Sequence, residues 1–232
     1  RIRCTRCGIA PRSSGRADDE MTLAYQRVLD RKRVALLPTL KLLTQRGFYL
    51  AGGTGLALQL AHRRSIDFDF YRPDDFDPER LHQALASRVR EARLVRIGDG
   101  TLIVRLNGVE CSGFRYAYPL LKPLVTNEYL AVASIEDIAA MKLAAVIQRG
   151  TRRDYVDLFV LIERFGLEKL LGLARKKYEG FNEYVALQAL TYFEDADRDP
   201  EPARLRLATP LTWEDVKRGI ERHVRAFIAD VS

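Results

Sequence analysis

Two aspartates separated by one residue follow a double-glycine turn in the stretch LAGGTGLALQLAHRRSIDFDFY, residues 50–71. Asp67 and Asp69 alternate with apolar residues, which is the pattern of a half-buried strand. Residues i and i+2 of a strand point to the same face, about 6.6 Å apart, so both carboxylates would project side by side. Either they are solvated acids on an exposed strand face, or they bind divalent cations, such as two Mg²⁺ or Mn²⁺ ions about 3.5–4 Å apart.

The turn before this strand has the composition of a phosphate-binding loop. Gly52 and Gly53 would let backbone N–H groups come close to a phosphate, because neither residue carries a side chain. Thr54 adds a hydroxyl at the predicted N-terminus of a helix, where the helix dipole favours anions. A Gly-Gly-Thr turn alone is common. Strand, turn, helix and aspartate strand in this order are more specific, and they predict a triphosphate site beside a metal-binding edge.

Further charged residues lie on two predicted helices later in the chain. Lys142 and Arg149 share one face of the first helix, and Asp154 and Asp157 share a face of the second. Basic residues on an otherwise apolar face indicate an anionic ligand, so Lys142 and Arg149 are candidate site residues. The alternative is an ion pair between Lys142 and Asp154 that joins the two helices. For Asp157 we favour a structural role.

A run of three basic residues, His62-Arg63-Arg64, stands between the glycine turn and the aspartates. Arg63 and Arg64 either bind nucleotide or RNA, with Arg64 as the nucleotide-binding candidate, or they form a solvated face. His62 is expected to pack or to form hydrogen bonds rather than to act as a base.

The elements that must position these residues follow from hydrophobic periodicity and turn residues. Residues 21–46 predict a helix that Pro38 splits or kinks. The segments that follow predict a buried strand at 48–51, a helix to 61, a strand at 65–71, a helix from Pro78, and strands at 94–97, 102–106 and 109–114. The last two strands are joined by Asn107-Gly108, a strong hairpin signal. This part is therefore a mixed α/β unit with a partly antiparallel sheet.

After residue 125 the pattern is helical. Ser134 and Asp137 form a capping box that begins a helix to about Arg149. Further helices are predicted at 153–165, 167–178, 182–193 and 212–229. We predict an α/β (α+β) fold in which a mixed sheet with flanking helices, residues 21–125, precedes a C-terminal helical domain, residues 126–232. That domain would contribute Lys142 and Asp154 to the site.

The composition is that of a soluble globular chain, with 47% hydrophobic and 30% charged residues among 232. No apolar run approaches the roughly 18 residues of a membrane span, and no export signal begins the chain, so we expect a cytoplasmic protein that does not contact membranes. A net charge of +7 permits a polyanionic partner. Three cysteines argue against a disulfide framework. Residues 1–20, where Cys4 and Cys7 form an isolated CxxC, are interpreted as a tail or expression remnant rather than a zinc site.

The order of these motifs resembles the DNA polymerase β-like nucleotidyltransferase superfamily, and within it the AbiEii/AbiGii toxin family. GGTGLALQLAHRRSIDFDF carries the first likeness. SIEDIAAMKLAAVIQRGTRRDYVDLFVLIE is similar to the lysine helix of the family and to its next helix, in which Asp-x-x-Asp follows a basic residue. FRYAYPLL resembles the linker, and LTYFEDADRDPEP with LTWEDVKRGI resembles the C-terminal end. The likeness covers nearly all of residues 35–228.

The resemblance implies a nucleotidyltransferase-type sheet and two groups of site residues. They are the triphosphate cradle Gly52, Gly53 and Thr54, and the catalytic residues Asp67, Asp69, Lys142 and Asp154, of which the first two bind metal. Members of the wider superfamily often carry a third acidic metal ligand on a later strand. Glu110, in GVECSGF, is the candidate here, because it alternates with Val109 and Cys111.

The implied reaction is metal-dependent transfer of NMP from an NTP to an acceptor hydroxyl. RNA, and tRNA in particular, is the acceptor that the family suggests, together with a cognate antitoxin and a place in toxin–antitoxin or phage-defence loci. A protein acceptor, self-modification or a small molecule of the antibiotic type stays open. So does a nucleotide- or RNA-binding module without turnover, which would keep the glycine turn but not need both aspartates.

Overall fold

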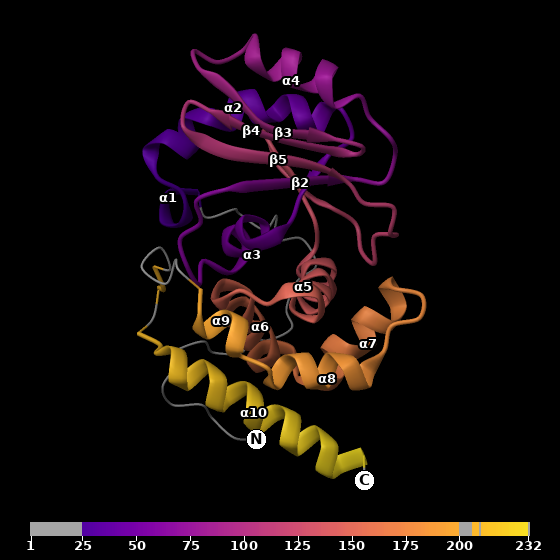
Figure 1. Ribbon diagram of the computed structural model, residues 1–232. Coiled ribbons are helices and arrows are strands. Elements are labelled where there is room, and N and C mark those ends of the chain that lie inside the picture. The colour runs from indigo at the N-terminus through magenta and orange to yellow at the C-terminus, as the bar shows by residue number, and fades with distance from the viewer. Residues whose placement is uncertain (1–24, 200–205, 209, 232) are drawn as a thin grey trace.

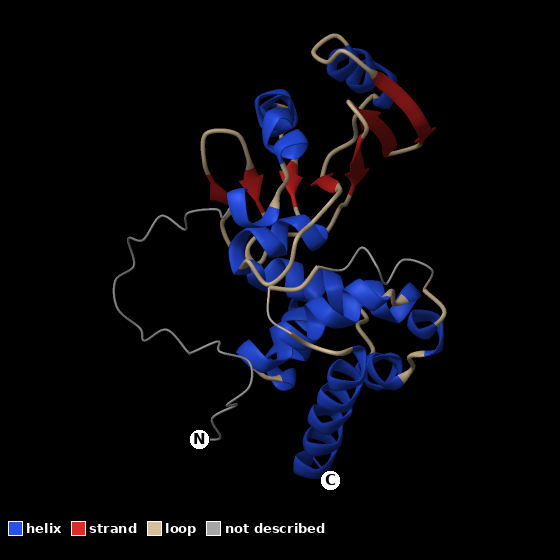
Figure 2. Cartoon of the chain, turned by 90° about the vertical axis from the view of Figure 1, so that its left-hand side faces the viewer, coloured by secondary structure: helices blue, strands red, loops and turns tan. Residues whose placement is uncertain are grey.

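The computed structural model describes residues 25–199, 206–208 and 210–231 of the chain. The expectations for residues 1–20, including Cys4 and Cys7, concern a segment outside these ranges. A mixed sheet with its own helices forms the upper half of the molecule, and the lower half is helical (Figures 1 and 2). The predicted α/β architecture with a C-terminal helical part is therefore confirmed.

The described residues form one seven-stranded sheet. Its strands are β1 (Tyr49–Leu50), β2 (Phe68–Arg72), β3 (Ala92–Gly98), β4 (Thr101–Leu106), β5 (Val109–Arg115), β6 (Val125–Thr126) and β7 (Ala131–Val132). They lie in the order β3-β4-β5-β2-β1-β7-β6. β3, β4 and β5 are antiparallel, β2 is parallel to β5, and β1 is antiparallel to β2 but parallel to β7. The predicted hairpin forms at Asn107 and Gly108, whose φ angles of 48° and 78° suit a two-residue turn.

Helices cover both faces of the sheet. The helices of the first half are α1 (Tyr25–Val28), α2 (Arg31–Gln45), α3 (Gly52–Leu60) and α4 (Pro78–Ala86). α2 and α4 lie on one face, and α3 lies on the other together with α5 (Ile135–Arg149) (Figure 1). Phe68 and Phe70 point into the core under α2 and α4, where neither is exposed. Because residues alternate along a strand, Asp69 points to the α3 side. β2 begins later than the strand predicted at 65–71, so Asp67 lies in the loop directly before it, and its carboxylate faces Arg153.

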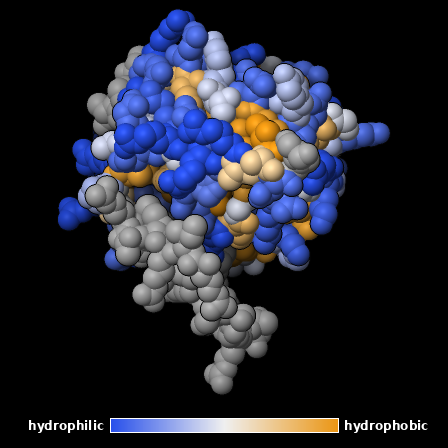
Figure 3. Space-filling view, turned by 90° about the horizontal axis from the view of Figure 1, so that it is seen from below, coloured by the Kyte–Doolittle hydropathy of each residue, from blue (hydrophilic) through white to orange (hydrophobic). Residues whose placement is uncertain are grey.

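The helical half continues from α5. Its other helices are α6 (Arg152–Phe165), α7 (Leu167–Lys177), α8 (Glu183–Thr191), α9 (Glu194–Asp197) and α10 (Trp213–Val231). Ser134 caps α5 as predicted, accepting a hydrogen bond from the Asp137 N–H at 3.0 Å. α10 buries Val216, Ile220 and Val224. Seen from the helical end, the surface is mainly hydrophilic with small apolar areas between (Figure 3). None of the described helices is both long and apolar enough to cross a bilayer.

The first predicted helix is interrupted at a different place. Pro38 does not split it, because Pro38 lies inside α2 and the interruption is at Leu29 and Asp30; a kink at Pro38 stays a prediction. The Asp30 side chain accepts a hydrogen bond from the Arg33 N–H at 3.0 Å and begins α2. Leu36, Leu37 and Leu40 are buried around Pro38, and their packing outweighs the one helical hydrogen bond that proline removes.

The sheet also continues past the predicted domain boundary at residue 125. β6 includes Val125, and β7 pairs with β1 through Val132 and Leu50. The purely helical part thus begins at Ile135, and the division into two domains stays a prediction.

Candidate active site

The glycine turn and the second aspartate are in direct contact. The Ala51 N–H donates a hydrogen bond to the Asp69 carbonyl at 3.0 Å, just before α3 begins. Gly52 has a φ of +59°, and a Cβ added there would lie 3.0 Å from Asp69 Oδ2. Only glycine therefore combines this backbone conformation with the approach of a carboxylate. The predicted phosphate cradle and the predicted metal-binding strand meet in the fold.

Asp67 and Asp69 form a pair of partly buried carboxylates. Burial raises the pKa of Asp69 above its ordinary value, and the negative charge of Asp67 adds to the shift. Burial likewise raises the pKa of Asp67, although the positive Arg153 opposes it. Ser112, which pairs with Asp69 from the neighbouring strand β5, acts in the opposite direction and lowers the pKa of Asp69. Both acids are thus held where their negative charge is costly and where a cation would be stabilised.

Lys142 lies between two carboxylates of the neighbouring helix. Its Nζ is 2.7 Å from Asp154 Oδ1 and 2.8 Å from Asp157 Oδ2, and the residue is 7% exposed. Burial acts to lower the pKa of Lys142, but the two carboxylates outweigh burial and raise it. The lysine is therefore charged at neutral pH, and its charge also lowers the pKa of Asp69. The ion pair between Lys142 and Asp154 that the sequence offered as an alternative is present.

Asp154 is held by the first turn of its own helix. Its Oδ2 accepts hydrogen bonds from the Thr151 hydroxyl at 2.6 Å and the Thr151 N–H at 3.1 Å, which completes a capping box. Burial acts to raise the pKa of Asp154, yet Lys142 and Thr151 lower it below its ordinary value. Asp154 is therefore an ionised carboxylate that orients Lys142. Because its pKa is lowered, Asp154 is poorly suited to accept a proton.

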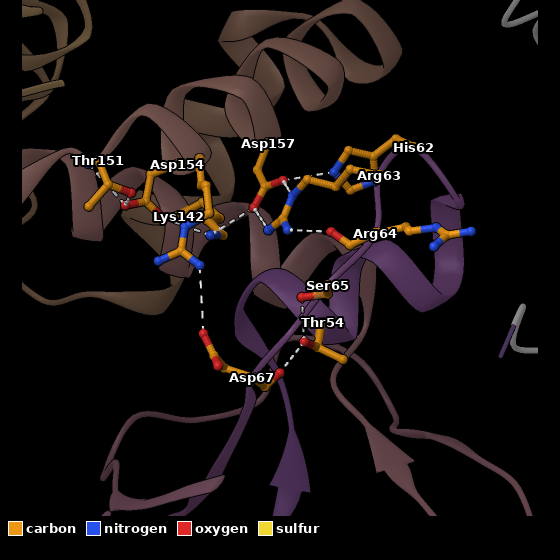
Figure 4. Close-up of polar contacts among 11 residues, drawn as sticks. Thr54, His62, Arg63, Arg64, Ser65, Asp67, Lys142, Thr151, Asp154 and Asp157 are labelled. Atoms are coloured by element: carbon orange, nitrogen blue, oxygen red, sulfur yellow. Dashed lines mark hydrogen bonds and ion pairs between the residues drawn. The ribbon is translucent and has the colours of Figure 1, made fainter. Parts of the chain in front are cut away.

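Behind Lys142 lies a buried network centred on Asp157 (Figure 4). Its carboxylate, which is not exposed, accepts two hydrogen bonds from Arg63, at 2.7 and 2.9 Å, and lies 2.7 Å from His62 Nε2. Burial acts to raise the pKa of Asp157, but Arg63 and Lys142 hold it well below its ordinary value. A Cβ on Gly53 would lie 2.1 Å from Arg63 Nη2, so Gly53 leaves room for this arginine. The structural roles expected for His62 and Asp157 match this geometry.

Three other residues predicted to bind the nucleotide do not point into this cluster of charged side chains. Thr54 is 2% exposed, and its hydroxyl bonds Ser65 Oγ at 2.6 Å and donates to the Asp67 carbonyl, so it fixes the approach to β2. Arg64 is exposed, and Figure 4 shows its side chain directed away from Lys142. Arg149 is also exposed, and it lines a hollow of about 410 Å³ between α5, α6 and α8 that contains none of the site acids. The structure does not bring Arg64 or Arg149 to the cluster.

Glu110 lies beside the aspartates without joining them. Glu110 and Ser112 alternate along β5, and Ser112 pairs with Asp69, so Glu110 lies on the side of the sheet that carries Asp69. Its negative charge contributes to the raised pKa of Asp67. However, its carboxylate is 3.2 Å from Arg105 on β4. Within the described ranges, no three side chains of His, Cys, Asp or Glu are grouped closely enough to hold a metal ion. A third ligand at Glu110 stays a prediction.

Arg153 is a site residue that the sequence reasoning missed. Its Nη1 lies 3.6 Å from Asp67 Oδ2, so it connects the start of α6 to the aspartate strand. The only sequence signal for it is its place in RRDYVD, directly before Asp154. Ser112 was missed as well, because its place beside Asp69 depends on the pairing of β2 with β5.

Comparisons with known proteins agree with this architecture. A family model described as the nucleotidyl transferase AbiEii toxin of type IV toxin–antitoxin systems matches residues 41–230. An uncharacterized protein of Aquifex aeolicus is 37% identical over 191 residues, which cover 78% of this chain and 88% of that protein.

Solved structures show the same fold. MenT4, a nucleotidyltransferase toxin of Mycobacterium tuberculosis, superposes with a TM-score of 0.57 at 20% identity, over 86% of this chain and 83% of MenT4. JHP933 of Helicobacter pylori does so with a TM-score of 0.55 at 16% identity, over 90% of this chain and 94% of JHP933. The chain is a nucleotidyltransferase, and it belongs to the AbiEii family of nucleotidyltransferase toxins.

Proposed function

We propose that this enzyme is metal-dependent and transfers NMP from an NTP to a hydroxyl group of RNA, with tRNA as the favoured acceptor. The acceptor oxygen attacks the α-phosphorus in line, a new P–O bond forms, and the bond to pyrophosphate breaks. The observation that carries the proposal is the contact of the glycine turn with Asp69 beside the charged Lys142. A phosphate cradle, paired carboxylates and a cation on one site are what nucleotidyl transfer requires.

The charges around the aspartates fit a divalent cation. Lys142 and Arg63 balance the two carboxylates of α6. Among the described residues, Asp67 is ion-paired with Arg153 and Asp69 forms no ion pair, which leaves one carboxylate without a directly bound cation. Carboxylate oxygens are the donors that Mg²⁺ and Mn²⁺ prefer. Asp67 and Asp69 would hold the ion, with Glu110 as a further candidate, and the bound ion would neutralise phosphate charge and activate the attacking hydroxyl.

The chain supplies the remaining contacts. The backbone N–H groups of Gly52 and Gly53 lie at the N-terminus of α3, where they can donate to phosphate oxygens. An ammonium group has three donor hydrogens, and Lys142 uses two of them on the carboxylates of α6. The third is free to stabilise charge on the leaving pyrophosphate. Asp154 keeps Lys142 in that orientation, and Thr54 holds the loop from which Asp67 projects.

RNA is the acceptor class that best suits the surroundings. The chain carries a net charge of +7, and Arg153 and Arg33 both act electrostatically on Asp67. Because toxins of type IV systems act with an antitoxin, we also propose a cognate antitoxin that counteracts this enzyme.

The test is incubation of the protein with α-phosphate-labelled NTPs, Mg²⁺ and total tRNA. We expect label on RNA with the wild type, and none with Asp69→Ala or after chelation of the metal. Asp74→Ala is the matched control, because Asp74 follows the same strand and its side chain is 78% exposed. Label on the protein itself or on a small molecule would show that this molecule, and not RNA, is the acceptor. RNA binding without any transfer would show a binding module instead of an enzyme.

A further inference from the structure

The strand register aligns Asp69 with an arginine at the edge of the sheet. Asp69 pairs with Ser112 on β5, and Ser112 pairs with Ile103 on β4. Ile103 in turn pairs with Arg96 on the edge strand β3. Residues paired across strands point to the same face, so Arg96 lies on the active-site face, three strands or about 14 Å from Asp69.

A second row runs parallel to the first. Glu110 pairs with Arg105, and Arg105 pairs with Arg93 on β3. Phe68 pairs with Cys111 on the parallel strand β5. The residues directly before them, Asp67 and Glu110, are therefore neighbours, and this row begins at Asp67. The two site aspartates therefore each begin a row that ends in an arginine of β3.

The face that carries these rows is open. On the opposite face of β4, the side chains of Leu102, Val104 and Leu106 are at most 1% exposed, beneath α2 and α4 (Figure 1). On the active-site face, Ile103 is half-buried and the side chain of Arg105 is 53% exposed. We call this surface, defined by Arg93, Arg96, Ile103 and Arg105, the basic sheet face.

The arginines of β3 are available to a ligand. Arg93 and Arg96 are exposed, and neither takes part in an ion pair within the described part of the chain. Arginine binds phosphate oxygens through a planar fork of donors, and free arginines on an open surface attract polyanions. A polyanion bound there could extend along the sheet face to the reacting centre, because one row leads from Arg96 to Asp69 and the other from Arg93 to Asp67.

An edge strand could instead pair with a strand of a protein partner. The ladder of β3 is interrupted by a bulge between Leu94 and Arg96, which disfavours regular edge pairing. The arginines also project from the sheet face rather than along the strand edge. Charge complementarity therefore favours a nucleic acid over a pairing peptide.

We infer that the basic sheet face binds the sugar–phosphate backbone of the RNA acceptor and directs its reacting end to Asp67 and Asp69. This inference rests on the proposed function, since it takes RNA to be the acceptor. Arg93 and Arg96 contact phosphates upstream of the reacting hydroxyl. They position the acceptor and do not touch the NTP.

The test compares Arg93→Gln/Arg96→Gln with Arg218→Gln/Arg225→Gln, a control pair with the same change of charge on α10. The control side chains are 71% and 75% exposed. Affinity for fluorescently labelled total tRNA is measured over a series of KCl concentrations, and NTP affinity is measured separately. Thermal unfolding checks that both variants are folded.

We expect Arg93→Gln/Arg96→Gln to bind tRNA about 5-fold more weakly per lost phosphate contact near 0.1 M salt, or about 25-fold in all. The slope of log affinity against log salt should fall by about 1.4, while NTP affinity stays unchanged. Equal tRNA affinity for the two variants, or no binding of tRNA by the wild type, would overturn the inference.

Transfer assays on the same proteins separate this inference from the proposed function. Salt-sensitive, arginine-dependent tRNA binding without labelling of RNA would support the basic sheet face and reject RNA as the acceptor. Labelling of RNA at the same rate by both double variants, at tRNA concentrations below saturation, would keep the proposed function and reject the basic sheet face.

Discussion

The guanidinium of Arg63 binds both carboxylate oxygens of Asp157, at 2.7 and 2.9 Å, and their side chains are 5% and 0% exposed. The two residues are 94 positions apart in the sequence. Their contact joins the segment before β2 to α6, and Lys142 binds the same carboxylate. The aspartate strand and the lysine helix are thus fixed to each other by one buried anion.

Asp157→Asn should destabilise the fold severely. The change leaves Arg63 and Lys142 buried with less opposing charge, which typically costs about 3–5 kcal/mol. Chemical denaturation measures it, with the exposed Asp74→Asn as a control that should not shift the midpoint. Because the pKa of Asp157 is lower in the folded than in the unfolded state, its contribution is present above the ordinary value of 3.8 and is lost as pH falls toward the folded value. A wild-type midpoint for Asp157→Asn would contradict the network.

Gly53→Ala should lower both activity and stability. The new methyl group would lie 2.1 Å from Arg63 Nη2, so the arginine must move off Asp157. Gly172→Ala is the control, because a Cβ there meets only the Arg175 guanidinium at 3.8 Å, in the interior of α7. That control should stabilise the protein by up to about 1 kcal/mol through helix propensity. Equal melting temperatures for the two variants would show that Arg63 does not depend on Gly53.

Asp69→Asn should make the metal-free protein more stable at neutral pH. An acid whose pKa is raised on folding binds its proton more tightly in the folded state, so the fold loses stability as pH rises from 3.8 through the raised value. The neutral variant avoids this loss, and its advantage should shrink toward pH 3.8. Melting curves of both proteins across this range provide the measurement.

Mg²⁺ should reverse that difference. Binding to the folded state stabilises it, so added Mg²⁺ should raise the melting temperature of the wild type and have a much smaller effect on Asp69→Asn. Protons compete with the metal for the same carboxylates, so more Mg²⁺ should be needed as pH falls. Equal responses of the two proteins to Mg²⁺ would place the ion elsewhere.

Expression of the wild type in a bacterial host should arrest growth. Asp67→Ala should relieve the arrest, because the site would lose one of the two carboxylates proposed to hold the metal, whereas Asp74→Ala should still arrest growth. Colony counts after induction measure the effect, and immunoblots confirm equal amounts of protein. Arrest by Asp67→Ala at the wild-type level would mean that toxicity does not depend on this site.

Local sequence patterns predicted much of the site. The alternation around Asp67 and Asp69 indicated one shared face, because a strand repeats every two residues. The glycine pair predicted a close approach to a phosphate, and the structure shows a second reason for glycine there, the approach of Gly52 to Asp69. The spacing of Lys142 and Asp154 across a short turn offered, as an alternative to ligand binding, the ion pair that forms. Each of these relationships depends on periodicity or on neighbouring elements, and both are visible in a single sequence.

Contacts between distant segments were not predictable in this way. Arg63 and Asp157 meet only because α6 packs against α3 and the segment that follows it, and nothing in either local sequence indicates the other. Arg153 differs from Arg152 only by the side of α6 on which it lies. Arg149 shares a helix face with Lys142, yet it lies two turns further on, beyond the reach of the acids.

The connection from the sheet to α5 determines how this enzyme can move. The Ala133 N–H donates to the Leu50 carbonyl at 2.9 Å, and the Gln59 side chain donates to the Ala133 carbonyl at 2.9 Å. These two bonds hold the start of α5 against β1 and α3, and they restrain the lysine helix beside the glycine turn. The nucleotide therefore meets a site that the fold has already assembled.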